Sequence, residues 1–187
     1  MNKKNIISTK NLAIVGLLIA MSIVLTRLAS IRIAIGGVEG IRIGFGKLPI
    51  VLGGFILGPV YGAFIGAIAD IVGYIIQPIG PYMPHFSVIS ALNGFLPITI
   101  LHLIGGEEDY QLFKMAVAIG ISIFVNDLLF LPYSLHLLFG IPWNILIIPR
   151  LFSVPVTIVL YTYIAHVFKN RNVIQFKQNH QRFRSFF

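Results

Sequence analysis

The sequence predicts an all-α integral membrane protein, a bundle of six transmembrane helices, on three observations. The chain has 187 residues, of which 57% are hydrophobic and only 11% are charged. Soluble domains carry about 45–50% apolar and about 25% charged residues, so this chain has too few charges to cover a water-facing surface. Its apolar residues fall into long runs, many near the roughly 20 residues that a helix needs to cross a membrane.

Six apolar runs give the expected helices, because backbone polar groups in lipid must form their hydrogen bonds within one segment. The spans we expect are residues 12–28, 43–57, 60–76, 86–104, 112–139 and 145–168. They leave no length for a soluble domain, so we expect one membrane domain over residues 1–187, with a basic tail at 169–187. Counts of five or seven spans stay open.

Two of the six runs depart from a simple spanning helix. The second is short and contains Lys47 and Pro49, so we expect its helix to be broken or partly buried by its neighbours. The fifth is long, and we expect it to tilt or to bend near Asn126, Asp127 and Pro132.

Basic residues that flank the first and last runs supply much of the net charge of +8. These residues are Lys3, Lys4, Lys10, Lys169, Arg171, Lys177, Arg182 and Arg184. Because cytoplasmic flanks carry an excess of Lys and Arg, the pattern predicts a cell-membrane protein with both termini in the cytoplasm. It also argues against nucleic acid as a partner. The connections at 29–42, 77–85 and 140–144 then face outward.

Six ionisable side chains lie within the expected spans or at their ends, where a charge costs at least about 2.5–3.5 kcal/mol at the membrane centre. They are Arg27, Arg42, Lys47, Asp70, Asp127 and Arg150. One interpretation is that they form ion pairs that tie helix ends together. The other is that some of them line a cavity, open to the outside, that binds a polar ligand.

The second interpretation assigns chemistry to several side chains. The guanidinium of Arg150 suits a carboxylate. The side-chain oxygens of Asp70, Asp127 and Asn126 suit neighbouring N–H donors of a heterocycle. Aromatic rings in the outer part either stack on such a heterocycle or form an aromatic belt at the lipid interface. They are Tyr74, Tyr82, Phe86, Tyr133 and Trp143.

No residue pattern points to catalysis or to a bound metal. The chain has no cysteine, and its five histidines are dispersed rather than set at a metal-ligand spacing. It has neither a Gly-x-Ser-x-Gly elbow nor a P-loop. We therefore expect a protein that is not an enzyme, with no catalytic residue, metal or cofactor. If it moves a ligand uphill, another chain must use the ATP.

Three consecutive motifs resemble the folate family of S components, the substrate-binding membrane subunits of energy-coupling factor (ECF) transporters. They are RIGFGKLPIVLGG at 42–54, LGPVYGAFIGAIADIVGY at 57–74 and PIGPYMPHFSVISALNGFLP at 78–97. GLLIAMSIVLTRL at 16–28 and IPRLFSVPV at 148–156 also fit the family. The resemblance implies a compact six-helix bundle of the S-component type with a vitamin site at its outer side.

The resemblance also implies a gate and a set of partners. The gate would consist of the connections after the first and third spans, with Gly37, Pro78, Gly80, Pro81 and Pro84. Gly16 and Ala20 match the family's small-x-x-x-small motif on the first helix, which docks to a transmembrane coupling subunit. Two cytoplasmic ATPase subunits drive that coupling subunit.

The ligand that the resemblance implies is folate. The residues expected to bind it are Arg32, Arg42, Asp70, Tyr82, Phe86, Asn126, Asp127, Trp143 and Arg150. The pterin donors would meet a carboxylate, the rings would stack on the aryl portion, and the arginines would meet the glutamate carboxylates. The fifth span departs from the folate pattern, so pantothenate and hydroxymethylpyrimidine remain alternative ligands. A structural membrane protein without a transport role is a further alternative.

Overall fold

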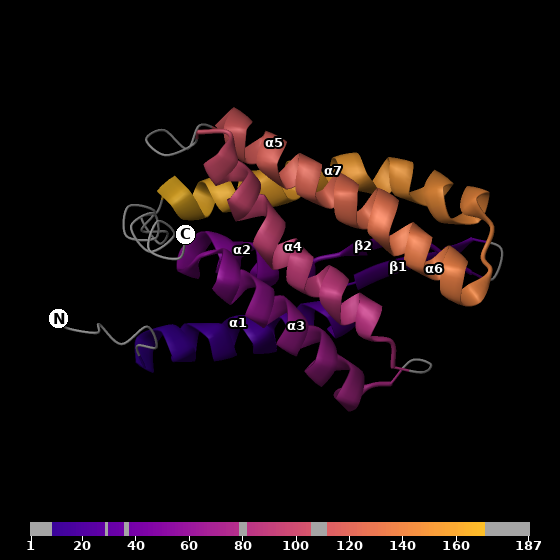
Figure 1. The fold of residues 1–187 in the computed structure, drawn as a ribbon, viewed down its shortest axis with the longest axis horizontal. Coiled ribbons are helices and arrows are strands. Elements are labelled where there is room, and N and C mark those ends of the chain that lie inside the picture. Colours follow the sequence, from indigo (N-terminus) through magenta and orange to yellow (C-terminus); the bar gives the residue numbers. More distant parts are fainter. Residues whose placement is uncertain (1–8, 29, 36–37, 79–81, 106–111, 171–187) are drawn as a thin grey trace.

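The computed structural model describes residues 9–28, 30–35, 38–78, 82–105 and 112–170, which form a helical bundle (Figure 1). Its elements are α1 (Thr9–Leu28), β1 (Ser30–Ile35), β2 (Val38–Gly44), α2 (Lys47–Leu57), α3 (Pro59–Ile76), α4 (Pro84–Leu103), α5 (Leu112–Ile123), the π-helical segment η1 (Phe124–Phe130), α6 (Leu131–Phe139) and α7 (Trp143–Asn170). Among these residues, five helical stretches are long and apolar enough to cross a membrane. With the shorter α2, they confirm the predicted six-helix membrane fold.

The connection after α1 contains two strands that the sequence analysis did not predict. β1 and β2 pair antiparallel and form a two-stranded sheet. The second helix consequently begins at Lys47 rather than near residue 43, because Ile43 and Gly44 belong to β2. Residues 31–35 alternate isoleucine with arginine or alanine, which is the two-residue period of a strand. An average of hydropathy over a long run does not detect that period.

The short helix α2 lies inside the bundle, as the sequence analysis expected for the second run. Nine of its 11 residues are buried. Its neighbours are α1, α3 and α4, all of which contact it. A helix of this length does not span a bilayer unaided, so its backbone is shielded by the surrounding helices.

The fifth span changes its helical geometry where the sequence analysis expected a bend. α5, η1 and α6 follow one another without a break from Leu112 to Phe139, and η1 contains Asn126 and Asp127. Pro132 stands in the first turn of α6. π-helical turns are rare and occur often at functional sites.

Glycines bring α2, α3 and α4 into direct backbone contact. A Cβ atom added at Gly62 would lie 2.7 Å from the Cα of Gly54 and 2.9 Å from the carbonyl carbon of Gly94. One added at Gly66 would lie 2.6 Å from the carbonyl carbon of Ser90. Small residues at four-residue spacing allow such close approach of membrane helices. We call α1–α4 the first helix group and α5–α7, with η1, the second.

The two helix groups meet through larger side chains. α4 contacts α5, and Phe55 of α2, Leu101 of α4, Met115 of α5 and Tyr161 of α7 belong to one buried cluster. A second cluster lies within the first group, around Leu18 and other residues of α1–α3. The interior is therefore apolar over most of the bundle, and the polar contacts described below are exceptions to it.

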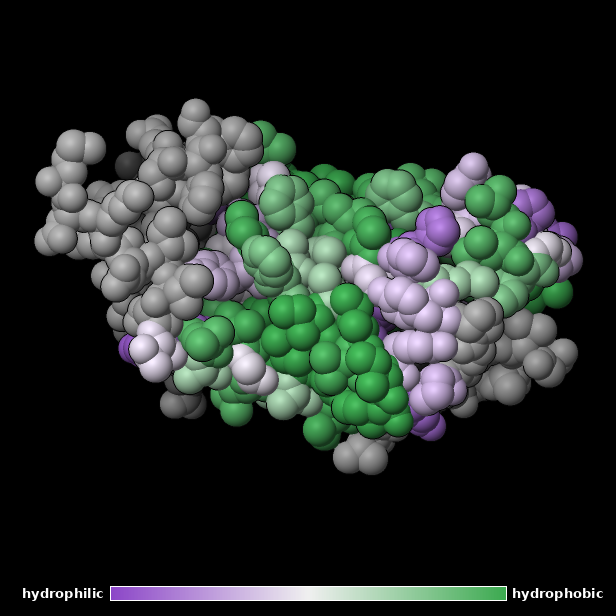
Figure 2. Space-filling model, turned by 60° about the horizontal axis from the view of Figure 1, so that its bottom comes forward, coloured by the Kyte–Doolittle hydropathy of each residue, from purple (hydrophilic) through white to green (hydrophobic). Residues whose placement is uncertain are grey.

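The outer surface is suited to lipid. Figure 2 shows a broad apolar area across the middle of one face, with hydrophilic residues gathered toward the right-hand end. Large apolar side chains point outward from several helices, among them Phe64, Ile75, Phe152 and Val159. In water such patches would drive association, whereas in a bilayer they contact the acyl chains. The chain is a multi-pass membrane protein.

Candidate ligand-binding site

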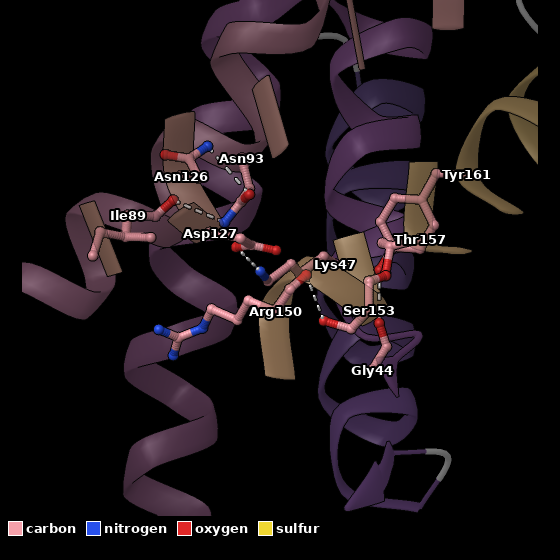
Figure 3. Close-up of polar contacts among 10 residues, drawn as sticks. All are labelled: Gly44, Lys47, Ile89, Asn93, Asn126, Asp127, Arg150, Ser153, Thr157 and Tyr161. Carbon is pink, nitrogen blue, oxygen red and sulfur yellow. Dashed lines mark hydrogen bonds and ion pairs between the residues drawn. The ribbon is translucent and has the colours of Figure 1, made fainter. Parts of the chain in front are cut away.

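An ion pair joins the two helix groups within the bundle. The ammonium of Lys47, the first residue of α2, contacts the carboxylate of Asp127 in η1, 80 positions away in the sequence (Figure 3). The side chain of Lys47 is 34% exposed and that of Asp127 is 16% exposed, so the pair is only partly shielded. Because a lone charge among membrane helices is costly, each partner helps to keep the other in place.

Two asparagines form a second bridge between the groups. Asn93 of α4 donates from Nδ2 to the carbonyl of Ile89 at 3.0 Å, and its Oδ1 accepts from Asn126 Nδ2 at 3.2 Å. Asn126 is fully buried, and its Oδ1 has no hydrogen-bond partner among the described residues. Figure 3 shows these amides near the Lys47–Asp127 pair, and Asn126 and Asp127 are consecutive residues.

A third bridge links the hairpin to α7. The hydroxyl of Tyr161 donates to the carbonyl of Gly44, the last residue of β2, at 2.7 Å. Arg150 is half-buried on the same helix, and in the view of Figure 3 its side chain runs just below the Lys47–Asp127 pair. Helix α7 contacts η1, which carries Asp127. Charged, amide and hydroxyl groups from α2, α4, η1 and α7 are thus gathered in one region, which we call the central polar cluster.

A separate network lies where the C-terminal half of α3 meets the start of α4. Ser87 donates to Asp70 Oδ2 at 2.6 Å, and the hydroxyls of Ser87 and Tyr82 are 2.9 Å apart. The rings of Tyr82 and Tyr74 have centroids 5.2 Å apart. The network ties the residues just before α4 to α3 and occupies Asp70 with a partner from the protein.

Two other predicted aromatic residues have distinct surroundings. Trp143, the first residue of α7, lies against His136 of α6 with ring centroids 4.9 Å apart. His136 in turn contacts the carbonyl of Ile141 through Nδ1 at 2.9 Å. Phe86 is half-buried in the first turn of α4.

The predicted gating residues and arginines are placed only in part. Pro78 is exposed after α3, and Pro84 is the first residue of α4. Arg32 and Arg42 are opposite each other in the register of the hairpin. Gly37, Gly80 and Pro81 lie outside the described residues.

Sequence reasoning missed several members of these networks. Lys47 stood out as a charge in a span but was not included among the ligand-binding residues, Ser87 was weighed only as a neighbour of His85, and Asn93 and Tyr161 were not singled out. A polar residue in an apolar run was the available signal for Asn93. Its partner in η1 depends on how the helices pack, which the sequence does not display.

The fold and this polar interior define a class: a multi-pass helical membrane protein that keeps ionisable groups between its helices. The family model of the ECF-type riboflavin transporter S component matches residues 6–171 of the chain. The folate transporter FolT of Clostridium novyi (strain NT) is 31% identical over 134 residues, which are 72% of this chain and 73% of the relative. The chain belongs to the S-component family of ECF transporters, and it is a transporter subunit rather than an enzyme.

Two solved structures share the fold. A crystal structure of FolT bound with folic acid matches with a TM-score of 0.69 and 22% identity, over 86% of this chain and 95% of that one. The S component of a bacterial ECF transporter matches with a TM-score of 0.62 and 19% identity, over 87% of this chain and 95% of that one. At these identities the two likenesses establish the architecture alone.

Proposed function

We propose that this S component binds folate or a reduced folate for uptake into the cell. The observation that carries the proposal is the central polar cluster, which combines two cations, one carboxylate and a buried amide oxygen that has no partner among the described residues. Folate combines the complementary features: a flat ring with N–H donors and a tail with two carboxylates. The likeness to a folate transporter at 31% identity supports the same ligand.

The charges in the cluster discriminate between vitamins. Riboflavin, after which the matching family model is named, is uncharged at neutral pH and offers no carboxylate to the guanidinium of Arg150, while Lys47 is already paired with Asp127. Pantothenate has a carboxylate but no aromatic ring, and hydroxymethylpyrimidine has a ring but no carboxylate. Among these four vitamins, only folate has both carboxylates for a cationic side chain and a heterocycle with N–H donors for the ring-binding groups. We therefore favour folate over these three alternatives.

Each ligand-binding residue takes a role that its surroundings allow. Asp127 and Asn126 face the pterin donors, and Asp70, already bonded to Ser87, is the alternative acceptor. Arg150 meets a glutamate carboxylate through its planar fork, helped by Arg32 and Arg42 of the hairpin. The stacking residues are Tyr82, Phe86 and Trp143. Pro78 and Pro84 stiffen the gating connection between α3 and α4; Gly80 and Pro81 of that connection, and Gly37 of the connection after α1, are the further predicted gating residues.

The coupling surface that we propose is one face of α1. Gly16 and Ala20 are exposed, and a Cβ added at Gly16 would meet no atom within 4 Å. A face with such small side chains lets a partner helix approach closely. Its partner is the transmembrane coupling subunit, which two cytoplasmic ATPases drive. The start of α1 and the end of α7 lie at the same end of the bundle (Figure 1), in keeping with both termini in the cytoplasm.

Calorimetric titration of the protein in detergent tests the proposed ligand. Folic acid, riboflavin, pantothenate and hydroxymethylpyrimidine are titrated separately, and mass spectrometry first checks for a molecule that co-purifies. We expect saturable binding of folic acid at nanomolar to low micromolar concentration and no binding of the other three. Riboflavin bound more tightly than folic acid would overturn the proposal. The fluorescence of Trp143, the one tryptophan in the chain, then reports whether its ring senses the occupied site.

A further inference from the structure

The two asparagines of the central polar cluster form a hydrogen-bond relay with one allowed direction. A backbone carbonyl can only accept, so the carbonyl of Ile89 requires the NH₂ group of Asn93 to face it, as observed at 3.0 Å. The Oδ1 of Asn93 must then face Asn126 and accept from its NH₂ group, as observed at 3.2 Å. An asparagine amide is oriented by its hydrogen-bond network. The orientation of both amides therefore follows from one main-chain carbonyl.

The relay ends in an acceptor. The Oδ1 of Asn126 is buried and has no hydrogen-bond partner among the described residues, although the residue is fully enclosed. Buried polar atoms without a partner are rare in proteins and call for an explanation such as a ligand or a water molecule. The surrounding segment η1 is π-helical, a geometry that occurs often at functional sites.

We propose that Asn93 is a positioning residue, which orients the Asn126 amide so that Asn126 Oδ1 accepts the lactam N3–H of the pterin ring. This inference rests on the proposed function and adds to it a rule of specificity. The 4-amino analogues of folate, such as aminopterin, have no hydrogen on N3, so this nitrogen becomes an acceptor. Asn126 Oδ1 and the unprotonated N3 of such an analogue are both acceptors and repel each other. A site that pairs with the N3–H donor of folate therefore binds the 4-amino analogue more weakly.

Three proteins and two ligands test the relay: the natural sequence, Asn93→Leu and Asn93→Asp, each titrated with folic acid and aminopterin. The natural sequence is expected to prefer folic acid by at least about tenfold. In Asn93→Leu nothing holds the Asn126 amide, which can turn its NH₂ group toward the ligand. We expect the preference to fall to within about threefold, because the amide can then pair with either ligand.

Asn93→Asp is the matched control. An ionised aspartate accepts through both oxygens, and a protonated one can donate to Ile89 and accept from Asn126, so either form keeps the direction of Asn126. The preference for folic acid should therefore survive in this variant even if both affinities fall. A residue with only a structural role would weaken both ligands equally and leave the ratio unchanged. Asn93→Met replaces the leucine variant if that protein does not fold.

The outcomes separate this inference from the proposed function. Equal affinity of the natural sequence for both pterins overturns the relay while leaving folate as the ligand. So does an unchanged ratio in a folded Asn93→Leu or Asn93→Met protein, which would show that the preference does not depend on how Asn93 orients the Asn126 amide. Binding of neither pterin overturns the proposed function and the relay together.

Discussion

Lys47 and Asp127 form an ion pair between α2 and the π-helical segment of the fifth span. Two further polar contacts among the described residues lie nearby: Asn126 donates to Asn93 between the helix groups, and Tyr161 of α7 donates to Gly44 of the hairpin. Removing a partner from a buried pair is destabilising chiefly because it leaves the other charge without compensation. The surrounding membrane raises that cost.

Replacing Asp127 by Asn should therefore destabilise the folded protein. The pair is partly exposed, so we expect a loss of about 1–3 kcal/mol, between the values typical of exposed and buried pairs. Thermal unfolding in detergent measures the effect. The double variant Lys47→Met/Asp127→Leu, which removes both charges, should recover most of the stability. Equal stability of Asp127→Asn and the natural protein would show that the pair contributes nothing.

Gly94→Ala tests the close approach of α3 and α4. The new methyl group would meet the backbone of Gly62, with the Cα of that residue only 2.9 Å away, and a backbone cannot move aside as a side chain can. We expect a loss of about 3 kcal/mol, the upper end of the usual range for overpacking. Gly120→Ala in α5 is the control, because its Cβ would meet Ile158 at an ordinary 3.7 Å. Similar melting temperatures for the two variants would contradict this packing.

Arg150→Ala separates the tail of the proposed ligand from its ring. A charge-assisted hydrogen bond is worth about 1.5–3 kcal/mol, so the affinity for folic acid should fall by roughly 10–100-fold. Pteroic acid lacks the glutamate and should lose much less. Arg150→Lys retains the charge without the planar fork, so its affinity for folic acid should lie between those of the natural protein and Arg150→Ala. Calorimetry gives both affinities, and an equal loss for the two ligands would remove Arg150 from the tail site.

Gly16→Trp should uncouple the protein without affecting its ligand site. The position is exposed on α1, so the tryptophan would face lipid in the isolated protein and block close approach of a partner helix. We expect folate binding to persist and both co-purification with the coupling subunit and cellular uptake to be lost. Val159→Trp, at an exposed position on α7, is the matched control. Uptake by Gly16→Trp at the level of this control would place the coupling surface elsewhere.

The transmembrane helices were predictable because lipid leaves a strong hydropathy signal in the sequence. The helices end at Leu28, Leu57, Ile76 and Phe139, where the apolar runs were expected to end. The hairpin was missed because hydropathy alone does not distinguish its partly apolar strands from the connection that leads into the next span. The alternation of isoleucine with arginine or alanine in residues 31–35 is the signal that would have predicted a strand.

The sequence indicated which residues belong to the candidate site but not which of them pair with one another. Asp127 and Arg150 stood out because charges in spans are rare, and Asn126 stood out with them. That Asp127 pairs with Lys47, and Asp70 with Ser87, depends on helix rotation and on the hairpin that sets the start of α2. Asn93 drew no attention because a single amide among apolar residues gives no hint of the partner that orients it.

The glycine contacts of α2, α3 and α4 divide the bundle into a stiff part and an adaptable one. At Gly62 and Gly94 the backbones of neighbouring helices touch, so neither glycine can be replaced by a residue with a side chain. The second helix group meets the first through side chains, which tolerate replacement more readily. A change of vitamin preference in evolution should therefore be concentrated in α5–α7 and η1. The glycine-packed helices α2–α4 would stay constant, so relatives with different cargoes would share this rigid half of the bundle.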